Sequence, residues 1–314
     1  MAERDAAAQA PTPETKLVQQ DGLVAAFARP PAGEAIRGAV VVLGGSGGGL
    51  SERDAIGFAR AGFAALALAY FGRPPLPAQL VEAPVETVGR GLEWLIGRPD
   101  VQQDRVALVG RSKGGELALL AAATYPDKVN AVVGYVPSPI VWQGVAFDRQ
   151  ARRSGPRSSW TIAGEPVPFL PYSRPRGVDM LRMTGMLVGR PTAIRPFYEG
   201  ALGDSAGVER ATIPIEGIAA PLMLISGGDD RLWPSSRLCE LAVDRLGAHR
   251  HPFACEHLRY AGAGHMITPP DLAPECTTTV GRLKMGGSEQ ANAAASAEAW
   301  PKVLELLTGP AALG

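Results

Sequence analysis

A serine in a glycine-flanked turn is the first residue of this sequence whose setting suggests chemistry. Ser112 lies in the segment Gly-Arg-Ser-Lys-Gly, which follows the apolar run RVALV and opens the helical run GELALLAAATY. A nucleophile elbow needs this order of strand, turn and helix, because small residues on both sides accommodate the strained serine backbone and the close packing of strand and helix. We predict that Ser112 is a nucleophile for acyl transfer, with a structural serine in a tight turn as the alternative.

A second Gly-x-Ser-x-Gly match surrounds Ser46 and leads to a different prediction. It lies in a run of five glycines among six residues, which cannot hold one side chain in a fixed place. Backbone N–H groups of such a loop suit an oxyanion hole beside the nucleophile. We predict donors at Gly45 and Ser46, with the N–H of Lys113 as the other donor. The run does not match the dinucleotide fingerprint, and the sequence has no Walker-type phosphate loop.

A hydroxyl nucleophile needs a general base, and four histidines are available. His265 lies in Ala-Gly-Ala-Gly-His-Met, directly after an apolar strand, so its ring can project from a glycine-built loop at the sheet edge. The other three, His249, His251 and His257, lie in the polar stretch GAHRHPFACEH, which is typical of a solvated loop or a strand edge. We predict that His265 is the base.

The carboxylate that orients this base is expected between the serine and the histidine, because α/β-hydrolases place the three residues in that order. The apolar run at residues 221–226 is followed by Gly-Gly-Asp-Asp-Arg-Leu-Trp-Pro, a turn that presents Asp229 and Asp230. By analogy with Gly-x-x-Asp turns of related hydrolases we predict Asp230 as the acid and Asp229 as a turn or capping residue. Three such motifs in this order indicate a catalytic triad.

The elements that must hold these residues repeat a rhythm of short apolar run, glycine-rich turn and helical stretch. This rhythm is typical of βα units on a mainly parallel sheet flanked by helices, and it predicts an α/β-hydrolase fold. The predicted strands cover residues 38–43, 61–69, 105–109, 131–136, 221–226 and 256–260. The predicted helices cover residues 55–60, 85–96, 115–124, 237–246 and 298–307. We also expect an opening hairpin around residues 16–28 and a surface turn at 286–296.

One hydrolase domain over residues 17–314 is the simplest organisation. Residues 1–16 are short of large apolar side chains and are predicted to be a disordered leader. The βα rhythm stops between about residues 137 and 219, where prolines and aromatic residues accumulate. A stretch of this length between two core strands is predicted to be a lid over the site.

The composition excludes several classes of partner. The 31 Lys and Arg residues balance 31 Asp and Glu residues, so no overall field attracts nucleic acid or an anionic membrane, and we expect a small-molecule partner. Three cysteines without CxxC spacing argue against a disulfide framework or a zinc site, and neither a metal nor a cofactor is predicted. The sequence lacks a signal-peptide pattern and a membrane-length apolar run, so a reduced, cytoplasmic protein is expected.

Seven segments together resemble a known family. They are LGGSGGGLSERDA (43–55), ALAYFGRPPLP (67–77), VGRSKGGELAL (109–119), YVPSPIVWQG (135–144), SSWTIAGEPVPFLPY (158–172), GGDDRLWPSS (227–236) and GAGHMITPP (262–270). The family is that of acyl-CoA thioesterases and bile acid-CoA:amino acid N-acyltransferases, in their C-terminal domain, and it is close to the dienelactone hydrolases. The resemblance spans most of residues 38–307. Mapped by motif, it implies the nucleophile Ser112, the acid Asp230 and the base His265.

The resemblance implies a serine hydrolase that cleaves acyl thioesters such as acyl-CoA through an acyl-enzyme. The nucleophile of the amidating members is a cysteine, whose thioester stays reactive toward amines. A serine forms an oxygen ester that suits attack by water, so we expect hydrolysis. Members often carry a β-sandwich domain ahead of the hydrolase domain, and here we expect it to be missing or reduced to a hairpin.

Candidate substrate-binding residues lie in the predicted lid. Arg152 and Arg153 are candidates for binding coenzyme A phosphates, with a solvated loop surface as the alternative. Trp142 and Trp160 are candidates for the acyl pocket, with the lid's own core as the alternative. Two further functions stay open: an ester or lactone hydrolase or acyltransferase of a specialised pathway, and a non-catalytic hydrolase-fold binding protein.

Overall fold

The fold was analysed in a computed structural model, which describes residues 13–146, 148, 153, 155–174, 177, 185, 189–269 and 277–309. Arg152, a candidate for phosphate binding, lies outside the described residues, and so does Cys276, one of the three cysteines. Residues 1–12 of the predicted leader lie outside them as well.

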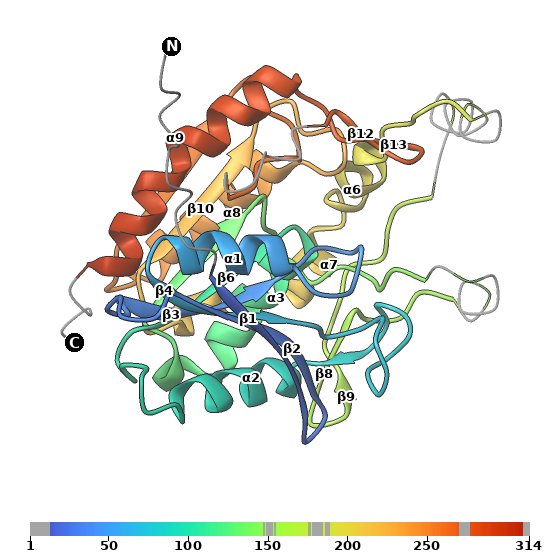
Figure 1. The fold of residues 1–314 in the computed structure, drawn as a ribbon. Coiled ribbons are helices and arrows are strands. Elements are labelled where there is room, and N and C mark those ends of the chain that lie inside the picture. Colours follow the sequence, from blue (N-terminus) through green and yellow to red (C-terminus); the bar gives the residue numbers. More distant parts are fainter. Residues whose placement is uncertain are drawn as a thin grey trace, which may run out of the picture.

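The centre of the fold is an eight-stranded sheet with the order β1-β2-β4-β3-β6-β7-β10-β11 (Figure 1). Its strands are β1 (Glu14–Gln20), β2 (Leu23–Arg29), β3 (Gly38–Leu43), β4 (Phe63–Leu68), β6 (Val106–Arg111), β7 (Ala131–Tyr135), β10 (Leu222–Gly227) and β11 (Cys255–Tyr260). From β4 to β11 in this order, all neighbouring strands pair in parallel. Strand β2 pairs antiparallel with both of its neighbours, β1 and β4. The predicted mainly parallel sheet is confirmed, and each predicted strand ends within two residues of an observed one.

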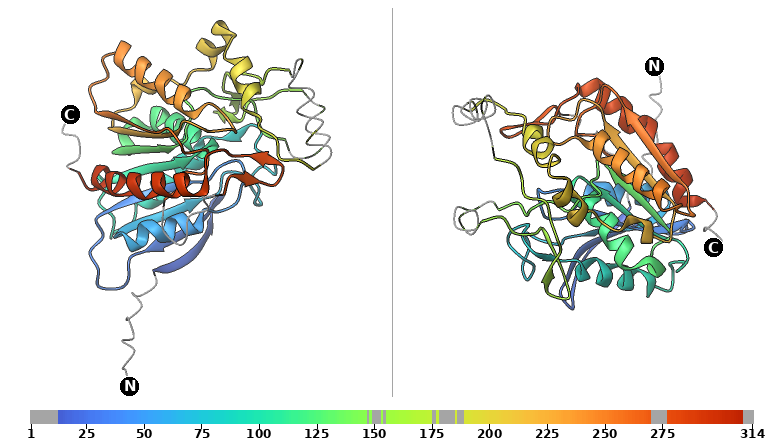
Figure 2. Two further views of the ribbon diagram at one scale, coloured as in Figure 1. Left: turned by 90° about the horizontal axis from the view of Figure 1, so that it is seen from above. Right: turned by 180° about the vertical axis from the view of Figure 1, so that it is seen from behind.

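Helices cover both faces of this sheet, as Figures 1 and 2 show from three directions. They are α1 (Glu52–Arg60), α2 (Glu86–Ile96), α3 (Lys113–Thr124), α8 (Ser235–Ala248) and α9 (Glu289–Thr308). The buried apolar side chains of α2 and α3, and most of those of α8, belong to one hydrophobic cluster, and those of α1 and α9 belong to another. The protein thus has an α/β-hydrolase fold, with helices on both faces of the sheet.

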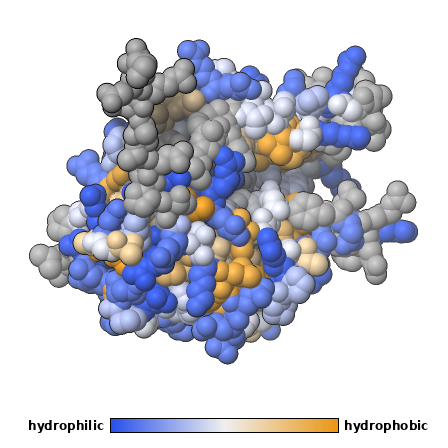
Figure 3. Space-filling model, viewed as in Figure 1, coloured by the Kyte–Doolittle hydropathy of each residue, from blue (hydrophilic) through white to orange (hydrophobic). Residues whose placement is uncertain are grey.

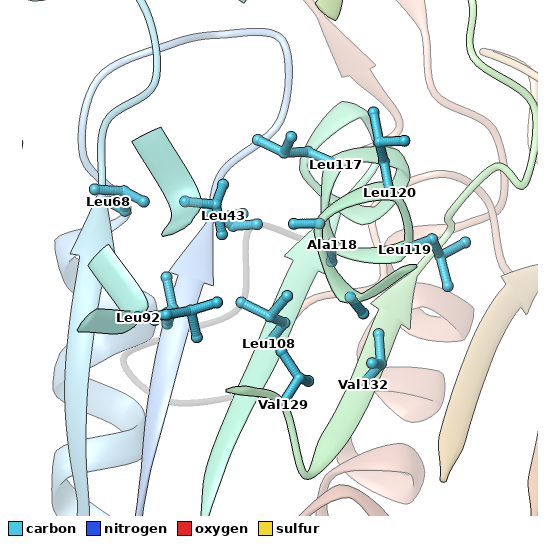
Figure 4. Packing of buried hydrophobic residues seen from close by; sticks show 14 of the residues in the cluster. Leu43, Leu68, Leu92, Leu108, Leu117, Ala118, Leu119, Leu120, Val129 and Val132 are labelled. Carbon is cyan, nitrogen blue, oxygen red and sulfur yellow. The ribbon is translucent and has the colours of Figure 1, made fainter. Parts of the chain in front are cut away.

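The strands are apolar throughout because successive side chains alternate between two buried faces. In β3, Val41 packs into the cluster under α2 and α3, whereas Val40 packs into the cluster under α1 and α9. Figure 4 shows Leu117 of α3 and Leu92 of α2 on the same side of the sheet as Leu108 of β6. Both faces are covered, so polar side chains can gather only at the ends of the strands.

The N-terminal hairpin is the one predicted around residues 16–28. Strands β1 and β2 pair antiparallel around a turn at Asp21 and Gly22. Strand β1 begins at Glu14, so residues 14–16 are in a strand although we had assigned them to the leader.

The stretch at residues 137–219 contains only short elements in its described part. They are β8 (Trp160–Ile162), β9 (Glu165–Pro166), α6 (Arg195–Ala201), α7 (Ser205–Ala211) and the 3-10 turn η2 (Ile215–Gly217). Strand β8 pairs with β5 (Ala83–Pro84) and β9 in a separate three-stranded sheet. The rings of Trp142, Tyr198 and Trp233 join the stretch to the turn after β10.

The last helix is longer than predicted. We expected a surface turn at residues 286–296, but α9 already begins at Glu289. The side chain of Ser288 caps it by accepting a hydrogen bond from the N–H of Ala291 at 3.1 Å, and four alanines in its first two turns favour the helical state. The predicted surface turn was wrong because the glycines at 286 and 287 suggested the start of a longer turn, and the helix cap at Ser288 was not recognised.

On the face drawn in Figure 3, hydrophilic residues predominate and apolar residues form scattered groups. Within the described ranges, none of the helices is both long and apolar enough to cross a bilayer.

Candidate active site

The turn between β6 and α3 holds Ser112 in a conformation that few residues other than glycine adopt. Its φ is +56° and its ψ is −120°, and its N–H donates to the carbonyl of Tyr135 at 2.9 Å. The glycines on either side are required by space: a Cβ on Gly110 would lie 2.1 Å from the carbonyl oxygen of Gly114. The strained backbone raises the serine side chain above the carboxyl end of the sheet, as a nucleophile elbow requires.

Gly114 makes the closest backbone contact between this elbow and the glycine loop. A Cβ on Gly114 would lie 2.2 Å from the carbonyl oxygens of Leu43 and Gly44, both of which are backbone atoms. We expect Gly114→Ala to lower the free energy of unfolding by roughly 1–3 kcal/mol, because helix α3 must move away from the loop. Gly247→Ala is the matched control, since a Cβ there meets nothing within 4 Å. Thermal unfolding of both variants checks this, and an unchanged melting temperature for Gly114→Ala would contradict the packing argument.

Three side chains predicted to act together form a continuous series of hydrogen bonds. Ser112 Oγ lies 2.9 Å from His265 Nε2, and His265 Nδ1 lies 2.8 Å from Asp230 Oδ2. Ser112 is 6% exposed, His265 4% and Asp230 0%. The arrangement has the geometry of a nucleophile, its base and the acid that fixes the base's tautomer.

The two neighbouring aspartates have different surroundings. Asp230 Oδ1 accepts hydrogen bonds from the N–H groups of Leu232 and Trp233 at 2.9 and 3.2 Å, which leaves Oδ2 for the histidine. Asp229 points away: it pairs with Arg231 at 2.5 Å and accepts from the N–H of Gly287 at 3.0 Å. Asp229 therefore connects two turns.

Backbone and ring contacts fix the loop that carries His265. The histidine N–H donates to the carbonyl of Met285 at 2.9 Å, and the preceding Gly264 N–H donates to Asn292 Oδ1 of α9 at 2.7 Å. The Trp233 ring stands edge-on to the imidazole with centroids 5.6 Å apart. Asn292, which anchors this loop, lies in the first turn of α9, a segment that we had predicted to be a surface turn.

The predicted oxyanion donors lie next to Ser112. Lys113 is the first residue of α3, so its N–H has no acceptor within the helix. A Cβ on Gly45 would lie 3.5 Å from Ser112 Cβ, which places the glycine loop against the serine. Gly45 and Ser46 also line the pocket above Ser112. The two segments thus lie side by side at the nucleophile, and the role of their N–H groups in an oxyanion hole stays a prediction.

The pocket has a volume of about 470 Å³, with Ser112 and His265 in its wall. The apolar side chains in its lining are Leu50, Leu232, Met266, Val280 and Met285, of which Leu232, Met266 and Met285 form one hydrophobic cluster. The charged residues in its lining are Glu52, Arg53, Asp54 and Arg111. Sequence reasoning missed both arginines, although Arg111 directly precedes Ser112 and Arg53 closely follows the glycine loop.

Three of the four predicted substrate-binding residues lie in the described part of the chain, and none of these three lines the pocket. Trp142 and Trp160 are fully buried, and their indole N–H groups donate to Ser138 and Glu116 at 2.9 and 2.7 Å. Arg153 is exposed, Arg152 lies outside the described residues, and the pocket lining includes no described residue of 137–219. Of the two roles considered for the tryptophans, the acyl pocket or a packed core, their burial within hydrophobic clusters favours the core. The lid role of the stretch stays a prediction.

Comparison with known proteins gives a match over most of the chain. A family model described as "BAAT / Acyl-CoA thioester hydrolase C terminal" matches residues 85–309. The peroxisomal succinyl-coenzyme A thioesterase of Mus musculus is 29% identical over 91% of this chain and 63% of its own length. The acyl-coenzyme A amino acid N-acyltransferase 1 of Mus musculus is 27% identical over 90% of this chain and 62% of its own length. The chain thus spans less than two thirds of the length of these relatives.

A solved structure supports the fold assignment. The dienelactone hydrolase-like promiscuous phosphotriesterase from metagenomic libraries superimposes with a TM-score of 0.57, over 95% of this chain and 98% of that one. Only 16% of the residues are identical, so the likeness concerns the fold alone.

Proposed function

We propose the function of this protein from the premise that the chain belongs to the BAAT / acyl-CoA thioester hydrolase C-terminal family, whose model matches more than half of its length. The protein hydrolyses acyl thioesters through an acyl-enzyme on Ser112. One observation carries the proposal: the series Ser112, His265 and Asp230 is hydrogen-bonded in the wall of a pocket.

The first half of the reaction acylates the serine. His265 Nε2 takes the proton of Ser112 Oγ as the oxygen attacks the thioester carbonyl, and Asp230 holds the resulting imidazolium through Nδ1–H. The carbonyl oxygen becomes an oxyanion that accepts hydrogen bonds from the N–H of Lys113 and from the loop at Gly45 and Ser46. The tetrahedral intermediate then breaks its C–S bond, and His265 gives the proton to the departing thiol.

The second half of the reaction returns the free enzyme. His265 removes a proton from a water molecule, whose oxygen attacks the ester carbonyl in the same oxyanion hole. Collapse of this intermediate breaks the bond to Ser112 Oγ, and His265 returns the proton to the serine. The products are a carboxylic acid and a thiol.

We expect the pocket to take the acyl part of a thioester substrate. Its apolar wall, which includes Leu232, Met266 and Met285, suits an acyl chain. Coenzyme A is larger than a pocket of about 470 Å³, so its nucleotide would lie outside, beyond the arginines at the pocket. The cytoplasmic location expected from the sequence stays a prediction, since one relative bears a peroxisomal name.

Thiol release from a panel of acyl-CoA thioesters, short to long, tests the proposal. We expect release that disappears after treatment with a fluorophosphonate, and peptide mass spectrometry should locate the adduct on Ser112. Turnover of p-nitrophenyl esters or lactones without thiol release would favour an ester hydrolase. An amide product in the presence of glycine or taurine would favour acyl transfer, the activity in the name of the mouse N-acyltransferase. A protein that neither labels nor turns over would be a binding protein.

A further inference from the structure

Two charged side chains lie in the core beside Ser112 without a part in the chemistry above. Lys113 Nζ contacts both carboxylate oxygens of Glu116 at 2.7 and 2.8 Å, and the two side chains are 3% and 0% exposed. Burying an ion pair costs desolvation free energy that apolar residues of the same size avoid. A pair in the helix that begins at the nucleophile therefore calls for a role other than stability.

Glu116 is the centre of a larger set of donors. Besides Lys113, its Oε1 accepts hydrogen bonds from Trp160 Nε1 at 2.7 Å and from the N–H of Trp142 at 3.2 Å. Burial raises the pKa of Glu116, and Lys113 and the two tryptophan donors lower it. Burial likewise lowers the pKa of Lys113, and Glu116 raises it. Because three donors converge on one carboxylate, we assign it the ionised state.

The contacts continue from Glu116 to the glycine loop on the other side of the nucleophile. The Trp160 ring packs against the Tyr70 ring with centroids 5.5 Å apart, and Tyr70 Oη donates to the carbonyl of Gly44 at 2.5 Å. The carbonyl of Gly45 lies 3.2 Å from the same oxygen. Tyr70 is 2% exposed, and burial raises the pKa of its hydroxyl, so it stays a donor.

A carbonyl held in this way also fixes an N–H group. The peptide bond is planar and trans, so the N–H of Gly45 points opposite to the carbonyl of Gly44, and the N–H of Ser46 points opposite to the carbonyl of Gly45. A run of glycines has too much conformational freedom to hold these directions alone. Tyr70 thus aims the loop donors, while the ion pair anchors the helix turn that carries the donor of Lys113.

We propose that Glu116 and Tyr70 are positioning residues of one buried network, Lys113–Glu116–Trp160–Tyr70, which sets the distance and direction between the two halves of the oxyanion hole. The inference rests on the proposed acyl transfer at Ser112. The network acts in the transition state, where the oxyanion forms, and leaves the binding of the neutral substrate unchanged.

Three conservative variants test the network. Tyr70→Phe removes one hydroxyl, Trp160→Phe removes one indole N–H, and Glu116→Gln removes the carboxylate charge. We expect each to lower kcat for p-nitrophenyl butyrate at least about tenfold at unchanged KM, since full loss of an oxyanion donor costs roughly a hundredfold or more. Tyr125→Phe and Trp300→Phe are matched controls: both rings are half-buried and lie outside the network.

A transition-state analogue separates positioning from a general loss of structure. A trifluoromethyl ketone adds to the serine and places its oxyanion in the same hole, so its inhibition constant should rise by the factor by which kcat falls. Circular dichroism melting identifies variants that fail to fold. If Glu116→Gln unfolds, Tyr70→Phe decides, because its ring still fills the core. A folded Tyr70→Phe with wild-type kcat and inhibition constant, or a change in KM alone, would overturn the proposal.

The double variant Tyr70→Phe/Glu116→Gln tests whether the contacts act as one unit. A single network predicts that it loses little more than the more damaged single variant, whereas multiplied losses would show independent sites and overturn the linkage. The second-order rate of fluorophosphonate labelling serves as a readout that needs no substrate. If the wild-type protein does not label at Ser112, the proposed function is wrong. If the wild type labels and the network variants label equally fast, the proposed function stands and this inference is wrong.

Discussion

Replacement of Ser112 by alanine is expected to lower thiol release from acyl-CoA by roughly a millionfold, because the attacking oxygen is gone while the pocket stays intact. The fold should persist, because the substitution removes only the hydroxyl that contacts His265, and an alanine methyl fits the same turn. Stopped assays with purified variant, alongside circular dichroism, measure both effects.

Ser46→Ala is the matched control for this substitution, because Ser46 belongs to the other Gly-x-Ser-x-Gly match and lines the same pocket. It keeps the backbone N–H that we assign to the oxyanion hole. Its turnover should therefore stay within about tenfold of wild type, since only the hydroxyl is lost. Activity that survives Ser112→Ala but not Ser46→Ala would reverse the assignment of the two motifs.

Asp230→Asn is expected to lower kcat by roughly ten-thousandfold, whereas Asp229→Asn should change it by less than about threefold. An asparagine at 230 presents an amide of similar shape but cannot stabilise the imidazolium, and its NH2 group can favour the wrong tautomer of His265. Asp229 is 39% exposed, and its pair with Arg231 lies outside the triad.

The two variants replace neighbouring residues by the same substitution, so the change in charge and in side-chain size is matched. Steady-state kinetics on one acyl-CoA or one p-nitrophenyl ester suffice for the comparison. Equal losses in both variants would mean that the turn as a whole, and not one carboxylate, orients the histidine.

We expect the pocket to determine which acyl group the protein accepts. The matched curated relatives are longer, and this chain spans 63% and 62% of the two described above. No residue of this chain aligns with the remaining parts of those relatives. The preferred acyl group is therefore inferred from the residues of the pocket. Its apolar wall at Leu232, Met266 and Met285 and its two arginines, Arg53 and Arg111, are the residues to vary in a search for chain-length preference.

Most of the sheet and the order of the active-site motifs could be predicted from local patterns. Apolar runs between glycine turns mark strands buried on both faces, and the elbow at Ser112 is identified by its glycines and the elements on each side. The late start predicted for α9 shows the limit of this reasoning, because a single cap at Ser288 decided where the helix begins.

Pattern also failed where a side chain's partner lies far along the chain. From aromatic character alone, Trp142 and Trp160 suited either an acyl pocket or the lid's own core, and the structure shows one indole donating to Ser138 and the other to Glu116. Arg111 was passed over because a charge beside the nucleophile does not show from sequence whether it faces the pocket. In both cases composition predicts burial or charge, and packing selects the neighbour.

The sequence by itself determined the α/β-hydrolase framework and the candidates Ser112, Asp230 and His265, because strand, turn and helix signals are local and the triad residues follow strand ends. The sequence favoured Asp230 over Asp229 only by analogy with related turns, and the tertiary structure supplied the contact of Asp230 with the histidine. That Glu116 joins α3 to Trp160 came from the tertiary structure alone. These contacts join residues 35 and 44 positions apart in the chain. Their free energy depends on distance, burial and the competing donors around each group, and none of these is encoded at a single position.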